Sequence, residues 1–530
     1  MPGSTTSVLR KITLSALAAA SMFAAGLGTA SAETLKVVAH SALRVLDPMM
    51  AGAYIIRNHA YMIFDTLLAT DAEGNIRPQM ADWTVSDDRL TYVFTLRDGL
   101  KWHDGQPVTA EDCVASLKRW GAKDAAGQVL MANTQSLAAL DERRIELKLK
   151  APNDFVLAAI GKPSSFVPFM MPKRLADVPV NQPIKEMVGS GPFKFDQAAF
   201  NPGVLVAYDK NQDYVPRNEP PSGLAGGKVA KVDRVEWVTM PDPQTAVNAL
   251  ASGEVDYVES VPVDLLPIIE NNEDVVVDLL DPGYQITAVF NTLHPPFDDP
   301  KKRRAALAAF NQKDVMDALI GDPRYYKLCG AMFGCGNPLE TDVGSEIVMK
   351  ADPEASKAML AEAGYANETV VIPHPTDLVL LRAPGIVGAD ALKKGGFNVD
   401  LQSKDWQTVL GQVASREAPD KGGWNMLITL LGVPDMANPI INERLNAKGT
   451  NGGAMGWLGD PKLEEMRAAF AASASADEQR KMAEEIQAYA YEQAVYAPLG
   501  QFFRVTAWSS SIDGIVRAPV TLFWNIEKNP

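Results

Sequence analysis

WTVSDDRLTYVFTLRDGLKWHDGQPVTAEDC, residues 83–113, contains the clearest local structural pattern of the chain. Tyr92, Phe94 and Leu96 alternate with polar residues, which is the pattern of a strand with one buried face. An Asp-Gly pair follows the strand and predicts a turn, because glycine readily adopts the backbone angles that tight turns require.

The second half of the stretch predicts a short strand and a helix. Leu100 and Trp102 resume the apolar alternation before another Asp-Gly turn. Thr109 with Asp112 three residues later predicts a capped helix whose buried face carries Cys113. Taken alone, this segment predicts a packing unit of two strands and a helix, without chemistry of its own.

Composition limits the class of protein. The chain has 530 residues, of which 47% are hydrophobic and 22% are charged, with a formal net charge of −15. Such a chain is expected to form two or three globular domains. No run of like charge stands out, so neither nucleic acid nor an anionic membrane is an expected partner.

The first 32 residues differ from the rest. Arg10 and Lys11 precede the apolar run Ile12–Leu27, and Ala30-Ser31-Ala32 has the small-residue pattern of a cleavage site. Residues 1–32 are therefore predicted to be a secretory signal peptide, with a membrane anchor as the alternative.

The three cysteines are expected to have different roles. Cys113 lies on the apolar helix face and is predicted to be an inert buried thiol. Cys329 and Cys335 bracket a short glycine-containing loop in a chain sent to an oxidising compartment, which predicts a disulfide. No histidine or further cysteine lies near them in sequence, which argues against a metal site.

Catalytic signatures are absent from the sequence. It contains no nucleophile elbow, no phosphate-binding glycine loop and no dinucleotide-binding motif, and its five histidines lack the spacing of zinc ligands. A Ser-His-Asp set assembled only in the fold leaves a secreted hydrolase as one alternative function.

Residues 83–113 closely resemble a marker of the family 5 extracellular solute-binding proteins, the periplasmic dipeptide, oligopeptide and nickel receptors of ABC importers. The positions that match this marker are Trp83, Ser86, Asp88, Tyr92, Phe94, Leu96, Arg97, Gly99, Lys101, His103, Asp104, Gly105, Pro107, Thr109, Ala110 and Asp112. Further motifs that resemble those of the family are VGSGPFKF (188–195), ALASGEVDYVE (249–259) and DPEASKAMLAEAGY (352–365). The resemblance extends over about residues 33–530.

The resemblance implies an α/β fold of the periplasmic-binding-protein type, with two lobes, three domains, a hinge and a ligand buried in the cleft. It divides the mature chain into domain I (33–65, 186–285 and 501–530), an inserted domain II (66–185) and domain III (286–500). It implies a monomeric receptor in the periplasm that captures a di- or oligopeptide and delivers it to a membrane ABC permease. No cofactor and no catalytic activity are expected.

The resemblance also indicates residues that contact the ligand. Peptide receptors carry a carboxylate in a W-x-x-D stretch before an Asp-Pro or Asn-Pro turn, where it pairs with the α-ammonium group of the peptide. The matching stretch here is ITLLGVPDMANPI (428–440), which places Asp435 in that role, although Leu431-Gly432 replaces the tryptophan. The alternative for Asp435 is that it only caps the Met436–Pro439 turn.

Other residues are weaker candidates for the cleft, and each could equally pack in the core. They are Ala53, Tyr54, Tyr284, Asn291, Trp406, Trp424 and Gln501. Two other ligand classes remain open. One is a small organic solute, such as an opine or an amino-acid derivative, which the missing tryptophan beside Asp435 supports. The other is a metal chelate or haem, against which the scattered histidines argue.

Overall fold

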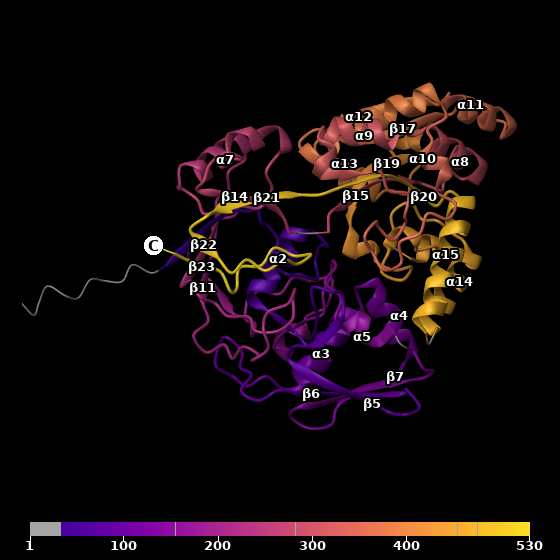
Figure 1. The fold of residues 1–530 in the computed structure, drawn as a ribbon. Coiled ribbons are helices and arrows are strands. Elements are labelled where there is room, and N and C mark those ends of the chain that lie inside the picture. Colours follow the sequence, from indigo (N-terminus) through magenta and orange to yellow (C-terminus); the bar gives the residue numbers. More distant parts are fainter. Residues whose placement is uncertain (1–32, 154, 281, 453, 474, 530) are drawn as a thin grey trace, which may run out of the picture.

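A seven-stranded mixed sheet forms the centre of the first lobe (Figure 1). Its strands in spatial order are β10 (Phe193–Phe195), β11 (Leu205–Lys210), β12 (Arg234–Val238), β1 (Thr34–Val38), β13 (Tyr257–Val258), β21 (Val505–Ser509) and β14 (Val275–Leu279). β1 runs parallel to β12 and β13, and the other neighbours are antiparallel. Helices α2 (Tyr54–Ile63) and α7 (Pro243–Ala251) contribute to the two hydrophobic clusters around this sheet.

This computed structural model describes residues 33–153, 155–280, 282–452, 454–473 and 475–529. The predicted signal peptide, residues 1–32, lies outside the described residues. Within them, no helix combines the length and apolar character needed to cross a bilayer.

A four-stranded antiparallel sheet is inserted into the first lobe and contains the strands formed by the first half of residues 83–113. Its strands in spatial order are β5 (Ala81–Val85), β6 (Thr91–Leu96), β8 (Arg144–Leu149) and β7 (Thr134–Ala139). Helices α3 (Ala110–Gly121), α4 (Ala125–Asn133), α5 (Phe155–Ile160) and α6 (Lys173–Ala176) belong to the same part of the chain. The short pairs β2 (Asp65–Thr66) with β9 (Phe169–Met170) and β3 (Leu68–Thr70) with β4 (Ile76–Pro78) lie beside them.

The strand and helix predictions for residues 83–113 are confirmed, with one correction. The apolar residues of β6 are buried, and Thr109 and Asp112 form a reciprocal capping box at the start of α3. The second predicted strand, around Leu100 and Trp102, is wrong. Only an isolated Lys101–Pro107 bridge forms there, because the Trp102 amide bonds to Gln106 O (2.8 Å) and closes the chain into a tight loop.

The second lobe is built on an antiparallel sheet that lies beside a parallel strand pair. The sheet has the order β16 (Tyr326–Lys327), β20 (Tyr496–Phe502), β15 (Tyr284–Phe290) and β19 (Met426–Gly432), and the pair is β17 (Thr369–Pro375) with β18 (Asn398–Lys404). Its helices are α8 (Pro300–Ala309), α9 (Gln312–Leu319), α10 (Glu346–Met349), α11 (Pro353–Glu362), α12 (Val379–Lys394), α13 (Trp406–Val413), α14 (Pro461–Ala472) and α15 (Ala476–Glu492). The last strand pair of the chain, β22 (Ile512–Asp513) with β23 (Glu527–Lys528), returns to the first lobe.

The chain crosses between the lobes from β14 to β15 and returns from β20 to β21. Figure 1 shows β20, the return crossing and β21 as one long yellow segment that leads from one lobe to the other. The crossings contact each other, because the Gln501 side chain donates to Pro282 O (3.3 Å). Two adjacent connections of this kind are a common arrangement for a hinge. The predicted domain boundaries stay a prediction.

Cys329 and Cys335 form the predicted disulfide, and Cys113 is free and buried. Burial raises the pKa of the Cys113 thiol, which keeps it protonated and unreactive.

Candidate functional site

A cavity of about 1610 Å³ lies between the two lobes. The first lobe contributes the end of β1 with residues 39–44, the start of α2 and the loop 164–166. The second lobe contributes residues 377–383, the end of β19 and parts of the segment 435–446, and residues 502–505 of the return crossing complete the wall. Pockets for drug-sized ligands span about 300–1,000 Å³, so this cavity has room for a larger solute.

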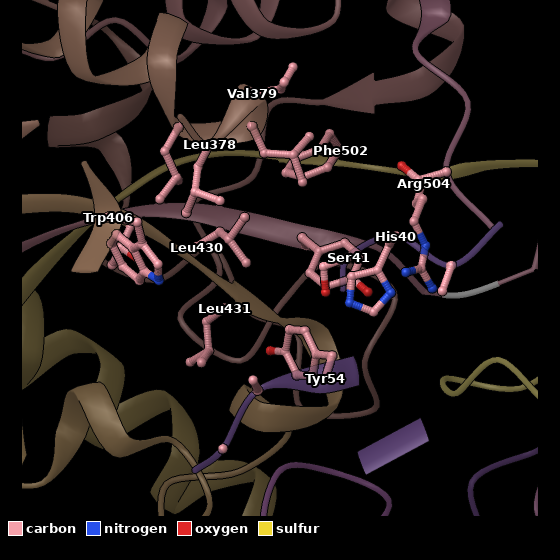
Figure 2. A pocket seen from close by; sticks show the side chains of 18 of the residues that line it. His40, Ser41, Tyr54, Leu378, Val379, Trp406, Leu430, Leu431, Phe502 and Arg504 are labelled. Carbon is pink, nitrogen blue, oxygen red and sulfur yellow. The ribbon is translucent and has the colours of Figure 1, made fainter. Parts of the chain in front are cut away.

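One wall of the cavity is apolar. Leu378, Val379, Trp406, Leu430 and Leu431 come from the second lobe, and Figure 2 shows them opposite the polar residues of the first lobe. A large apolar surface with a few fixed polar groups is the usual composition of a small-molecule site.

The polar centre of the cavity is the Asp435 carboxylate, which is 6% exposed. Tyr54 Oη donates to Asp435 Oδ2 (2.7 Å), and the backbone amide of Ser165 donates to Asp435 Oδ1 (2.6 Å). The amide of Gly432 in turn donates to Tyr54 Oη (2.7 Å). These three hydrogen bonds join the first lobe, which contains Tyr54 and Ser165, to the second lobe.

The local sequence explains how Asp435 reaches this position. β19 ends at Gly432, and Pro434 lies within the 3₁₀ turn Val433–Met436 that follows. A Cβ at residue 432 would lie 2.9 Å from Tyr54 Oη, so glycine permits the close approach of the two lobes. The next turn is closed by Asn438 Oδ1, which accepts from the amides of Ile440 and Ile441. Asp435 therefore points across the cavity instead of capping the turn that follows it.

Tyr54 keeps its proton at this site. Burial, together with the nearby Asp435 charge, raises its pKa well above the ordinary value, so the hydroxyl acts as a donor at neutral pH. The Arg57 guanidinium lies 4.7 Å from the centre of the Tyr54 ring, and the Tyr284 ring lies 5.6 Å away. A cation over the ring face is a favourable contact that helps to hold the ring in place.

A second cluster of polar side chains in the first lobe is centred on Glu259. His40 Nδ1 and Arg504 lie 2.8 and 3.1 Å from its carboxylate, and Thr521 donates to it (2.5 Å). Burial alone would raise the pKa of Glu259, but His40 and Arg504 hold it below its ordinary value. His40 and Arg504 also line the cavity, where Figure 2 shows them side by side.

Five of the residues predicted to contact ligand line the cavity, and three do not. The five are Ala53, Tyr54, Tyr284, Trp406 and Asp435. The other three, Asn291, Trp424 and Gln501, are fully buried elsewhere and are absent from the lining.

Each of these three has a partner in the protein interior. Asn291 donates to Trp424 O (2.8 Å), and the Trp424 ring packs 6.0 Å from the Trp457 ring. Gln501 accepts from the amide of Cys335 (2.9 Å) and donates to the carbonyl of the same residue (3.0 Å), which fixes one end of the disulfide loop.

Sequence reasoning missed several residues of the site. Ser165, His40, Arg444 and Arg504 all line the cavity. No motif or periodicity distinguishes them, because their place in the cavity depends on how the two lobes meet. Among the residues that the structure describes, no group of three or more histidine, cysteine, aspartate or glutamate side chains is placed to hold a metal ion.

Two lobes linked by paired crossings, with a cavity between them, define the class of two-lobed solute-binding proteins. The sequence pattern of the bacterial extracellular solute-binding proteins, family 5 Middle, matches residues 75–452. The chain therefore belongs to the family 5 extracellular solute-binding proteins, as its sequence motifs indicated.

One curated relative and two solved structures show the extent of the similarity. The chain is 37% identical over 522 residues to the probable peptide ABC transporter periplasmic-binding protein y4tO of Sinorhizobium fredii, with 97% of each chain covered. It resembles AgaA of A. tumefaciens R10 in complex with agropinic acid (TM-score 0.78, 22% identity, 94% of this chain and 99% of that one). It also resembles a dipeptide-binding protein of Pseudoalteromonas sp. SM9913 in complex with Met-Leu (TM-score 0.78, 18% identity, 94% and 100%). At these identities, the two structures bear on the fold alone.

Proposed function

We propose that this protein is a periplasmic receptor that captures a di- or oligopeptide by hinge closure and delivers it to an ABC import permease, without catalysis of its own. Asp435 pairs with the α-ammonium group of the peptide. The observation that carries the proposal is the state of this carboxylate, which is buried on the cavity wall with neutral donors as its two partners. The 37% identity to a probable peptide-binding protein supports the same ligand class.

The electrostatics of Asp435 favour a cationic ligand. No lysine, arginine or histidine of the described residues forms an ion pair with it, and burying a lone charge is costly. A carboxylate offers about four lone-pair sites. Tyr54 and Ser165 occupy two of them, so an ammonium group can bind without displacing either donor.

The bonds between the lobes connect ligand capture to closure. Tyr54 and Ser165 belong to one lobe and Asp435 to the other, so the carboxylate has both of these donors only when the cleft is closed. A ligand stabilises the closed form only as far as it binds that form better than the open one. A peptide held at Asp435 meets this condition, and the permease then receives the closed, loaded receptor.

Peptide titration tests the proposal. Thermal unfolding and calorimetry of the full mature chain with a panel of two- to five-residue peptides should show a rise in Tm and saturable binding. N-acetylation removes the ammonium charge and should weaken binding at least about tenfold, and Asp435→Asn should have a similar effect.

Asp460→Asn is the matched control, because Asp460 also accepts a hydrogen bond from a tyrosine but lies away from the cavity. It should leave peptide affinity unchanged. Binding of N-acetylated peptides as tightly as free ones would show that Asp435 does not pair with an amine.

A further inference from the structure

Arg444 is a buried cation of the cavity wall whose guanidinium has little coordination by the protein. Its side chain is 5% exposed and lies in the 3₁₀ turn Glu443–Leu445 of the second lobe. Its ion-pair partner is Glu443, with Nη1 and Oε1 3.0 Å apart, and the Glu443 side chain is 54% exposed. Arg444 Nε is buried and has no hydrogen-bond acceptor among the described residues.

This arrangement is unusual for a buried arginine. The guanidinium group carries five N–H donors in a planar fork that matches a carboxylate. An ion pair with a solvent-exposed glutamate contributes little, since water screens it and competes for both groups. Nη2 has no acceptor among the described residues and, unlike Nε, is not fully buried, so it is the part of the fork that an acceptor inside the cavity can reach.

The other basic side chains of the cavity lining are less suited to this role. Some are paired with buried carboxylates: Lys162 with Asp124, and His40 and Arg504 with Glu259. The others are exposed to solvent, namely Arg44, Lys123 and Arg382. Among the described lining residues, Arg444 combines a buried guanidinium with an exposed ion-pair partner.

We infer that Arg444 binds a carboxylate group of the ligand, which rests on the proposed function of the receptor. Arg444 and Asp435 lie nine positions apart on one segment of the second lobe, and both line the same cavity. One wall thus presents a negative and a positive group, which complements a ligand that carries an ammonium and a carboxylate. The carboxylate is supplied by the C-terminus of the peptide or by an acidic side chain.

Three mixed tripeptide libraries distinguish these sources. The first has free C-terminal carboxylates, the second consists of the corresponding C-terminal amides, and the third consists of amides with glutamate at the second position. The apparent Kd of the full mature chain for each library is read from the concentration that gives half of the maximal Tm gain. The variants are Arg444→Gln, Arg444→Lys and the control Arg324→Gln, which removes an exposed, ion-paired arginine away from the cavity.

The wild type and Arg324→Gln should bind the free-acid library at least about tenfold more tightly than the amides, the factor expected for a charged hydrogen bond. If an acidic side chain supplies the carboxylate, the glutamate library should recover that affinity. In Arg444→Gln, the apparent Kd values for the three libraries should lie within about twofold of one another. Arg444→Lys should retain part of the preference for ligands with a carboxylate.

The failures of the two proposals can be told apart. A preference for carboxylates that is the same in wild type and Arg444→Gln overturns the role of Arg444 and leaves the peptide receptor intact. Equal binding of all three libraries by the wild type overturns the same role. If no library stabilises the wild type, the peptide receptor and the inference built on it both fall. The melting temperature without ligand reports whether each variant is folded.

Discussion

Tyr54→Phe should weaken ligand binding through the loss of one hydroxyl group. This hydroxyl donates to Asp435 (2.7 Å) and accepts from the amide of Gly432 (2.7 Å), and both partners belong to the opposite lobe. A hydrogen bond to a charged group contributes about 1.5–3 kcal/mol and a neutral one about 0.5–1.5 kcal/mol. In the open form water hydrates all three groups, so removing the hydroxyl destabilises the closed form alone.

The expected net effect is about 2 kcal/mol, or roughly a thirtyfold rise in Kd, mainly through faster dissociation. Calorimetry with the tightest peptide of the panel measures the affinity, and stopped-flow measurement of intrinsic tryptophan fluorescence measures the dissociation rate. Small-angle scattering of the variant should show a larger radius of gyration at subsaturating ligand, since fewer molecules are closed.

Tyr489→Phe is the matched control. Tyr489 donates to Asp460 (2.9 Å), and both residues belong to the second lobe, so this bond does not depend on closure. The control should lower the free energy of unfolding and leave Kd unchanged. If Tyr54→Phe changes Kd by less than about threefold while the control behaves as expected, the bonds between the lobes do not contribute to closure.

Three further predictions concern stability. Burial lowers the pKa of His59 to about 3 and that of His103 to about 4, while a histidine of the unfolded chain protonates near pH 6.5. Each of the two should therefore make the free energy of unfolding fall with decreasing pH by about 1.4 kcal/mol per unit between about pH 6 and pH 4. His59→Asn should reduce the measured slope in urea titrations by that amount, and an unchanged slope would refute the assignment. Gly189→Ala places a Cβ 2.1 Å from the carbonyl oxygen of Ile63 and should lower the free energy of unfolding by roughly 3 kcal/mol or more. A decrease below about 1 kcal/mol would show that the backbone can shift at little cost. Replacing Cys329 and Cys335 by serine should cost about 2 kcal/mol, as expected for a short closed loop, and an unchanged urea midpoint would contradict this.

Much of the fold follows from signals within a few residues of one another. The alternation in β6 and the Thr109–Asp112 capping box predicted their elements correctly, since burial of one face and a local hydrogen bond suffice to define them. Local signals also compete with each other. Ser475, for example, caps α15 and accepts from the amide of Glu478, although Asp477 two residues later is also a residue type that favours a helix start.

The site was less predictable, because its contacts join distant parts of the chain. Tyr54 and Asp435 are separated by 381 positions, and Ser165 and Asp435 by 270. Local periodicity in the sequence therefore cannot predict that either pair is in contact. Trp424 was a candidate because the resemblance places a tyrosine-like residue ahead of the Asp435 strand. The neighbours of a side chain depend on packing, however, and Trp424 is buried against Trp457. Arg444 carries no sequence signal, because the weakness of its ion pair depends on the exposure of Glu443.

Mass spectrometry of the ligand that co-purifies with the receptor is the most direct test of its function. The wild-type protein should be isolated from its native host without denaturation, and the bound molecule released with acid and fragmented. We expect one or more short peptides with a free N-terminus, present in smaller amounts in Asp435→Asn. A bound solute without peptide bonds, such as an opine or a metal chelate, would contradict this expectation.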